Sequence, residues 1–190
     1  MAFQLSKSEK MIQALAKEFA DKELAPIAAE MDANNHMNAE ILEKLGDLGF
    51  MGIGVPKEYG GSGFGMMAKS LMVTELAKQC AATAEVMSVH TMAINPIMWY
   101  GTEEQKKKYL GGSAKGQIAA FALTEPSAGS DAAGVQTVAL ADGDDYVING
   151  SKCFISNMGD HGDFVTILAR TDPTKGYKGM STIIVDRGTP

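Results

Sequence analysis

The sequence predicts an α+β protein, with an all-α helical domain over residues 1–116 and an antiparallel, barrel-like β-domain over residues 117–190. Two observations predict it. Through the first hundred or so residues, apolar side chains recur at the 3.6-residue spacing of helices that bury one face. From Gln117 onward, short runs rich in β-branched and aromatic residues alternate with turn residues. The apolar pattern therefore changes near Gln117, where we place the domain boundary.

The first two helices have recognisable starts and stops. Ser6-Lys-Ser-Glu9 is a capping box that opens a helix, and Pro26 kinks or ends it. A second helix begins near Asn38 and stops at Gly49. Their inward faces carry Ile12, Leu15, Ala16, Phe19, Ile41, Leu42, Leu45 and Leu48.

Two further segments, residues 66–80 and 83–94, are apolar enough to be largely buried helices, with Asn95-Pro96 as the joint after them. The many methionines here either fill the core or line an adaptable ligand groove. Thr102-Glu-Glu-Gln105 is a second capping box, and the following Lys106–Lys108 is a solvated helix end.

A connector with seven glycines, Gly49–Gly65, separates the second and third helices. It is not a dinucleotide-binding loop, because Met66 stands where the third glycine of that motif belongs, Pro56 interrupts the segment, and no strand precedes it. We expect an extended loop that lets helices cross closely.

Six short strands are expected in the second half, at residues 118–123, 135–140, 146–149, 151–156, 164–169 and 181–185. Asn149-Gly150 favours a type I′ hairpin, because both residues tolerate positive φ. This hairpin would put Phe154 and Ser156 on a strand beside the turn from Thr124 to Ser130.

Composition excludes several classes of function. A net charge of −6 and a pI near 5.1 argue against a nucleic-acid partner. We expect no membrane partner and a cytoplasmic location, because no apolar run nears the roughly 20 residues of a membrane span and the N-terminus shows no leader pattern. Cys80 and Cys153 lack metal-type spacing, so we predict neither a disulfide framework nor a metal site.

The stretch from Phe121 to Asp131, Phe-Ala-Leu-Thr-Glu-Pro-Ser-Ala-Gly-Ser-Asp, carries the clearest functional signal. It joins a strand to a turn whose backbone N–H groups and hydroxyls can face one polar heterocycle. Ala128 and Gly129 leave room for close approach. The alternative is an ordinary surface loop in which Ser, Gly and Asp only satisfy turn geometry.

Five segments together carry a family resemblance: the helical first half, Gly-Ile-Gly-Val-Pro-Lys-Glu-Tyr-Gly-Gly, Gly101-Thr-Glu-Glu-Gln-Lys-Lys-Lys-Tyr-Leu110, Thr-Glu-Pro-Ser-Ala-Gly-Ser-Asp, and Asn-Gly-Ser-Lys-Cys-Phe-Ile-Ser-Asn. In this order, from about Leu5 to Asp186, the chain resembles the acyl-CoA dehydrogenases, most closely the short-chain and butyryl-type members. The resemblance implies a helical domain, a middle β-domain that is incomplete here, and a C-terminal helical bundle that this chain lacks.

The resemblance also implies site residues. Two segments correspond to the flavin-binding segments for FAD, and Ser130 also corresponds to a contact with the CoA part of the substrate. The residues implied for FAD are Phe121, Ala122, Leu123, Thr124, Gly129, Ser130, Phe154, Ile155 and Ser156. Ala84, Ser88 and Met92 correspond to the wall of the acyl pocket. The chain departs from many members at Ser127, Phe154 and Ser156, where those members carry Gly, Trp and Thr.

The activity implied is FAD-dependent α,β-dehydrogenation of a short-chain acyl-CoA to the trans-2-enoyl-CoA, with an electron-transfer flavoprotein as acceptor and a homotetramer as the intact assembly. The catalytic base is expected in the missing C-terminal domain, so we expect this segment alone to be inactive. Alternatives are an enoyl-CoA reductase or acyl-CoA oxidase of the same fold, or a non-catalytic acyl-CoA- or flavin-binding module.

Three other side chains could be mistaken for functional groups. Glu125 lies in the flavin loop, where burial could tune a carboxylate for proton transfer. We assign it a structural role, because Pro126 fixes the turn behind it and the resemblance gives it no catalytic one. Glu85 and His90 are interpreted as ordinary helix residues rather than ligands.

Overall fold

The computed structural model describes residues 4–159 and 161–190. The described chain divides into two compact units at the Gln117–Ile118 bond. The first unit is helical and the second is built around one β-sheet, as predicted. The expectation that the N-terminus shows no leader pattern concerns residues that lie partly outside the described part.

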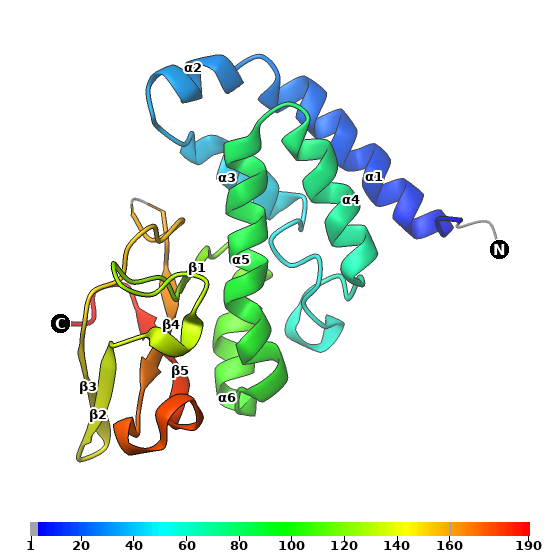
Figure 1. Ribbon diagram of the computed structural model, residues 1–190. Coiled ribbons are helices and arrows are strands. Elements are labelled where there is room, and N and C mark those ends of the chain that lie inside the picture. The colour runs from blue at the N-terminus through cyan, green and yellow to red at the C-terminus, as the bar shows by residue number, and fades with distance from the viewer. Residues whose placement is uncertain (1–3, 160) are drawn as a thin grey trace. The chain divides into compact units, whose positions relative to one another are not determined.

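The helical unit (Figure 1) confirms the predicted starts and stops. Ser6 Oγ accepts a hydrogen bond from Glu9 N at 3.2 Å, and Asn38 Oδ1 accepts from Glu40 N at 2.8 Å. Gly49 has a φ of 73°, which favours glycine just past a helix end. The elements are α1 Lys7–Phe19, the π-helical turn Ala20–Leu24, α2 Ala28–Ala33, α3 Ala39–Asp47, a 3₁₀ turn Lys57–Tyr59, α4 Met66–Ala77, α5 Ala81–Tyr100, α6 Glu103–Gln105, a π-helical turn Lys106–Leu110, and α7 Gly111–Ser113.

One helix boundary was predicted wrongly. Asn95-Pro96 does not end a helix, because α5 continues through Pro96 to Tyr100. Proline removes one backbone N–H from the helix, but Ile94 and Ile97 on either side are both buried and keep the apolar face continuous. Tertiary packing therefore outweighs the local preference of proline.

The core of the first unit forms where α4 packs between α1 and α5. Met72 of α4 and Met87 of α5 are fully buried, alongside Phe50 and Leu45. Met66 and Met92, on the same two helices, are exposed. Core filling therefore accounts for Met72 and Met87, whereas Met66 and Met92 lie on an open surface and do not belong to the core.

The second unit contains a five-stranded mixed sheet, so the prediction that all its strands are antiparallel was wrong. The strand order is β1-β4-β2-β3, with β5 on the other edge of β4. β4 pairs in parallel with β1 and β2 and antiparallel with β5. The strands are β1 Ala119–Ala122, β2 Val138–Asp142, β3 Asp145–Asn149, β4 Phe164–Arg170 and β5 Met180–Asp186.

The predicted hairpin at Asn149-Gly150 is also wrong. Asn149 is the last residue of β3 and pairs with Val138, so the hairpin joins β2 to β3 around Gly143 instead. Gly143 has a φ of 63°, and positive φ at the first central position is the type II′ pattern. Residues 151–156 consequently form no strand.

Residues 4–159 and 161–190 contain neither a membrane-spanning helix nor a cluster of metal ligands. No helix there has the length and apolar character needed to cross a membrane. No group of three or more His, Cys, Asp or Glu side chains lies close enough to hold a metal ion.

Gly150 is required for space, not for its backbone angle. A Cβ at this position would lie 2.2 Å from Thr137 Oγ1 and 2.7 Å from Thr137 Cα. We expect Gly150→Ala to destabilise the protein by about 1–3 kcal/mol, as overpacking does. Urea unfolding checks this, with Gly159→Ala as the matched control because its Cβ would meet nothing within 4 Å. Equal midpoints for the two variants would contradict the expectation.

Candidate functional site

The turn after β1 is closed by its own backbone. Glu125 N donates to Ala128 O at 2.9 Å, and Ala128 N donates to Glu125 O at 3.1 Å. Pro126 and Ser127 therefore lie at the tip, where both are exposed, while Glu125 and Ala128 are buried. The turn thus has a buried base and an exposed rim.

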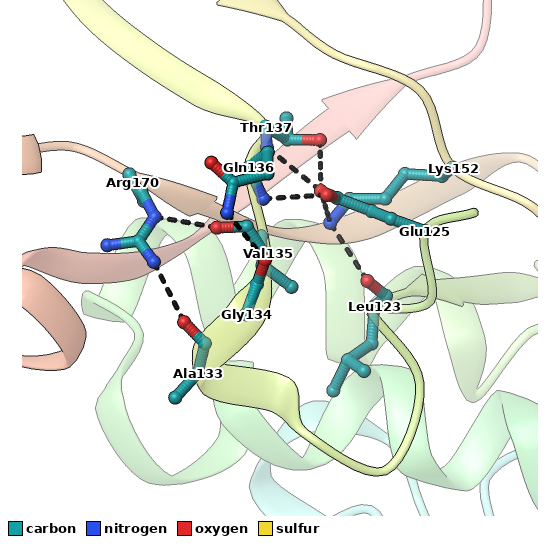
Figure 2. Close-up of polar contacts among 9 residues, drawn as sticks. All are labelled: Leu123, Glu125, Ala133, Gly134, Val135, Gln136, Thr137, Lys152 and Arg170. Carbon is teal, nitrogen blue, oxygen red and sulfur yellow. Dashed lines mark hydrogen bonds and ion pairs between the residues drawn. The ribbon is translucent and has the colours of Figure 1, made fainter. Parts of the chain in front are cut away.

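The carboxylate of Glu125 organises this base (Figure 2). It accepts hydrogen bonds from Gln136 N at 2.6 Å and from Thr137 N at 2.9 Å, and a short one from Thr137 Oγ1. Lys152 Nζ lies 2.9 Å from the same carboxylate. One side chain therefore joins the turn to the entry of β2 and to the segment after β3.

These partners explain the charge state of Glu125. Burial raises its pKa, but the hydrogen bonds from Thr137, Gln136 and Lys152 together outweigh burial and hold the pKa at about 2. A general base for neutral pH needs the opposite shift. Glu125 is therefore a fixed anion with a structural role, in agreement with the sequence interpretation.

The second predicted segment lies directly beside the first. Cys153 N donates to Thr124 O at 3.0 Å, and Lys152 Nζ donates to Leu123 O at 2.9 Å. The structure thus brings together the Thr124 turn and the Phe154 segment, although these residues are about 30 positions apart in sequence.

Phe154 is held in an unusual way. Its φ is 56° and its side chain is 92% exposed, a costly combination for an aromatic residue. The next residue, Ile155, packs against the buried cluster of Ala120, Ala122 and Val165. Inward and outward side chains therefore alternate here as they would in a strand, although this segment is not one: Ile155 points inward, while Phe154 and Ser156 are exposed.

The rim of the site offers unused hydrogen-bonding groups. Within the described part of the chain, the hydroxyls of Thr124, Ser130 and Ser156 have no hydrogen-bond partner. A Cβ on Gly129 would meet nothing within 4 Å, so the space above this residue is open. Free hydroxyls next to an exposed aromatic ring fit a ligand that has a polar edge and a flat face.

The remaining predicted cofactor residues lie on or just after β1. Ala122 is buried in the sheet, and Phe121 and Leu123 are half-buried. Leu123 contributes through its backbone, since its carbonyl accepts from Lys152.

The three predicted acyl-pocket residues of α5 do not all lie in the same place. Ser88 and Met92 line a groove of about 260 Å³ between α4 and α5. Ala84 is buried in the core and does not line it.

Glu85 and His90 behave as the sequence interpretation states. Glu85 is exposed, and His90 is fully buried with Nε2 3.1 Å from Met51 O. Burial lowers the pKa of His90 to about 4, so the imidazole is neutral near pH 7.

Sequence reasoning missed the residues that support the site. Arg170 donates from Nε to Val135 O at 2.6 Å and from its guanidinium to Ala133 O at 2.8 Å, which positions the loop before β2. Lys152 was easier to find from sequence than Arg170, because it directly precedes the predicted Phe154–Ser156 segment. Nothing local in the sequence marks Arg170.

Comparison with known proteins identifies the family. The profile of "Acyl-CoA dehydrogenase, N-terminal domain" matches residues 6–117, and that of "Acyl-CoA dehydrogenase, middle domain" matches residues 120–190. The helical unit, the mixed sheet and the paired segments at Thr124 and Phe154 are thus parts of one architecture. The chain belongs to the acyl-CoA dehydrogenase family.

Two curated relatives show where in the family the similarity is high. The acryloyl-CoA reductase (NADH) of Anaerotignum propionicum is 49% identical over 100% of this chain and 49% of its own length. The short-chain-specific acyl-CoA dehydrogenase of Clostridium acetobutylicum is 46% identical over 99% of this chain and 50% of its own length. The chain thus spans about half the length of the curated relatives it matches.

Solved structures show the same fold. Butyryl-CoA dehydrogenase from Megasphaera elsdenii matches with a TM-score of 0.93 at 39% identity, covering 100% of this chain and 51% of that one. A chain from the structural study of the electron transferring flavoprotein of Acidaminococcus fermentans matches with a TM-score of 0.96 at 42% identity, covering 100% and 50%. A chain of the FAD complex of PigA matches with a TM-score of 0.90 at 34% identity, covering 100% and 50%.

Neutralising Glu125 tests its structural role. The folded-state pKa lies below the ordinary value near 4.5, so its contribution to stability is present above about pH 4.5 and is lost as pH falls toward 2. We expect Glu125→Gln to cost about 3 kcal/mol at pH 7, since it leaves Lys152 buried without its counter-ion.

The measurement is the free energy of unfolding against pH for the wild type and Glu125→Gln. The gap between the two curves should shrink below pH 4.5. Glu104→Gln, at an exposed position of α6, is the control and should change stability by less than about 0.5 kcal/mol. A gap that stays constant from pH 7 to pH 2 would show that the charge of Glu125 contributes nothing.

Proposed function

We propose that the protein to which this chain belongs is an FAD-dependent acyl-CoA dehydrogenase that converts a short-chain acyl-CoA to the trans-2-enoyl-CoA. The observation that carries this proposal is the hydrogen bond from Cys153 N to Thr124 O, which holds together the two segments that we predict to bind the flavin. The short-chain-specific relative and the butyryl-CoA dehydrogenase structure support the substrate class.

In this proposal the two segments hold the flavin ring. The free hydroxyls of Thr124, Ser130 and Ser156 bond to its polar atoms, and the exposed ring of Phe154 packs on its face. Phe121, Ala122 and Leu123 support the turn from β1, and Gly129 leaves room for close approach. The solved FAD complex of a related protein supports the choice of cofactor.

When bound, FAD supplies the hydride acceptor for the substrate Cβ. The chain's own residues supply orientation, because a misplacement of about 1 Å can cost roughly 100-fold in rate. Glu125 takes no part in proton transfer, since its carboxylate is fully engaged and its pKa lies at about 2. We place the base that removes the α-proton outside these residues, and we expect these 190 residues alone to be inactive.

Reduction of an enoyl-CoA is the second candidate function. The observation that favours it is the 49% identity to an acryloyl-CoA reductase. The same site would serve both directions, because flavin chemistry at Cα–Cβ is reversible and direction depends on the redox partner.

The redox partner and the assembly are further parts of this proposal. We propose an electron-transfer flavoprotein as the redox partner, supported by the structural match to a chain from such a study. We also propose a homotetramer for the intact enzyme and no nucleic-acid partner, given the net charge of −6.

An anaerobic titration of the flavin-loaded full-length protein tests the proposed function. Butyryl-CoA should bleach the flavin absorbance near its visible maximum, and a dehydrogenase should release crotonyl-CoA to an added electron acceptor. Phe154→Ala should weaken FAD binding by about 10-fold, the loss of one aromatic contact. Tyr177→Ala, which removes another exposed aromatic side chain, is the control and should leave FAD binding unchanged. A full-length protein that purifies without flavin and takes none up from solution would refute the proposal.

A further inference from the structure

The groove between α4 and α5 has a polar floor that the proposed function does not use. From α4 it is lined by Met66, Lys69, Ser70 and Val73, which follow the i, i+3, i+4, i+7 pattern of one helix face. Met66 and Ser70 are exposed at the rim, whereas Lys69 is only 7% exposed. The groove therefore holds a cationic side chain at its base.

The facing side of the groove repeats the pattern. From α5 it is lined by Ser88, Thr91, Met92 and Asn95, again one helix face. None of the residues that line the groove is acidic. At about 260 Å³ it lies just below the roughly 300–1,000 Å³ of pockets for drug-sized ligands, so it suits a short chain.

Lys69 has no counter-ion in the part of the chain that the structure describes. Within residues 4–159 and 161–190, no hydrogen bond or ion pair involves its amine, and burial lowers its pKa. The buried carboxylate of the same helix is treated differently: Glu75 accepts from Gln13 Nε2 at 2.8 Å and from Lys78 Nζ at 2.7 Å. Buried lysines are rare unless paired. We therefore expect the Lys69 amine to bind an acceptor that does not belong to these residues.

The glycine connector makes room for this lysine. A Cβ on Gly54 would lie 1.9 Å from Lys69 Cε and 2.4 Å from Lys69 Nζ. The φ of Gly54 is not positive, so its backbone conformation does not require glycine. Glycine is required here because a side chain would overlap Lys69. Two segments of the sequence thus combine to place the amine at the base of the groove.

Asn95 adds a second polar group without a partner. Its Oδ1 is buried and has no hydrogen bond, and no bond within the described chain involves its Nδ2. If the Asn95 side-chain amide rotates about its terminal bond, its N–H₂ group faces the groove and can donate to an acceptor on a ligand there. An ammonium and an amide N–H₂ together match the two oxygens of a carboxylate.

We propose that the α4–α5 groove is a carboxylate subsite in which Lys69 and Asn95 bind the distal carboxylate of a dicarboxylic acyl group. This inference rests on the proposed function, because Ser88 and Met92 of the same groove are our candidates for the acyl-pocket wall. The apolar side chains of Met66, Val73 and Met92 contact the short methylene chain, and the substrate is a CoA thioester with a carboxylate at its far end.

Two thioesters with the same five-carbon chain test the subsite. Glutaryl-CoA ends in a carboxylate and pentanoyl-CoA in a methyl group, and the Kd of each follows from flavin absorbance in the full-length enzyme under anaerobic conditions. We expect glutaryl-CoA to bind about 10-fold tighter, the value of one hydrogen bond to a charged group. Lys69→Met should abolish this preference and change pentanoyl-CoA binding by less than about threefold.

Two further variants separate position from charge. Gly54→Ala should also abolish the preference, because its Cβ displaces the amine. Lys10→Met removes an exposed lysine of α1 and should leave it intact. Equal affinity of the wild type for both thioesters, or a preference that survives Lys69→Met, overturns the subsite while leaving the proposed function standing.

A second measurement does not depend on flavin or on turnover. Reductive methylation of the unmodified full-length protein, read by mass spectrometry, should label Lys69, and free glutarate should protect it while pentanoate does not. A Lys69 that resists labelling without any ligand would already be paired inside the full-length protein, which overturns the proposal. Equal protection by the two acids overturns it as well. If neither thioester perturbs the flavin, the proposed function fails, and this labelling result alone decides the subsite.

Discussion

The three hydrogen bonds and the Lys152 ion pair at the Glu125 carboxylate are the constraint on which the shape of the candidate site depends. They replace the backbone pairing that a strand would have provided, because residues 123–137 lie outside the ladders of the sheet. The backbone N–H groups of Gln136 and Thr137 have no partner in a sheet ladder, and one buried carboxylate accepts from both. The same anion neutralises Lys152 and thereby brings Phe154 next to the turn.

The described part of the chain holds buried charged side chains both with and without a counter-ion. Glu75 and Glu125 are buried with cationic partners, so each pair balances much of its cost of leaving water. Lys69 is buried without an opposite charge in the described chain, and its neighbour His90 is neutral. An unbalanced charge of this kind lowers stability, and natural proteins accept such a cost mainly at sites that bind something.

The sequence was sufficient where local chemistry decides the structure. The helix starts at Ser6, Asn38 and Thr102 depend on contacts within three residues, and all three were predicted correctly. The sheet depends on distant pairing. The continuous apolar run from Phe164 was interpreted as an antiparallel strand, but a strand buried on both faces is typical of a central position with parallel neighbours. Asn149-Gly150 has the composition of a hairpin turn, yet contact with Thr137 explains Gly150 better. Of the candidate site, the approach of the Phe154 segment to the Thr124 turn could be predicted from sequence, but the Arg170 contacts span 35 and 37 positions and could not.

In the closed turn at Glu125 and Ala128, some residues hold the loop in shape and their neighbours are exposed at the surface. The two buried positions anchor the loop through their paired backbone hydrogen bonds, and Pro126 fixes the turn between them, whereas Ser127, Gly129 and Ser130 are exposed and lie outside that pairing. Mutations at the exposed positions are therefore free to alter affinity for a ligand while the loop keeps its shape. Such a division lets one scaffold diversify its chemistry by single substitutions, and it makes this rim a practical starting point for redesign.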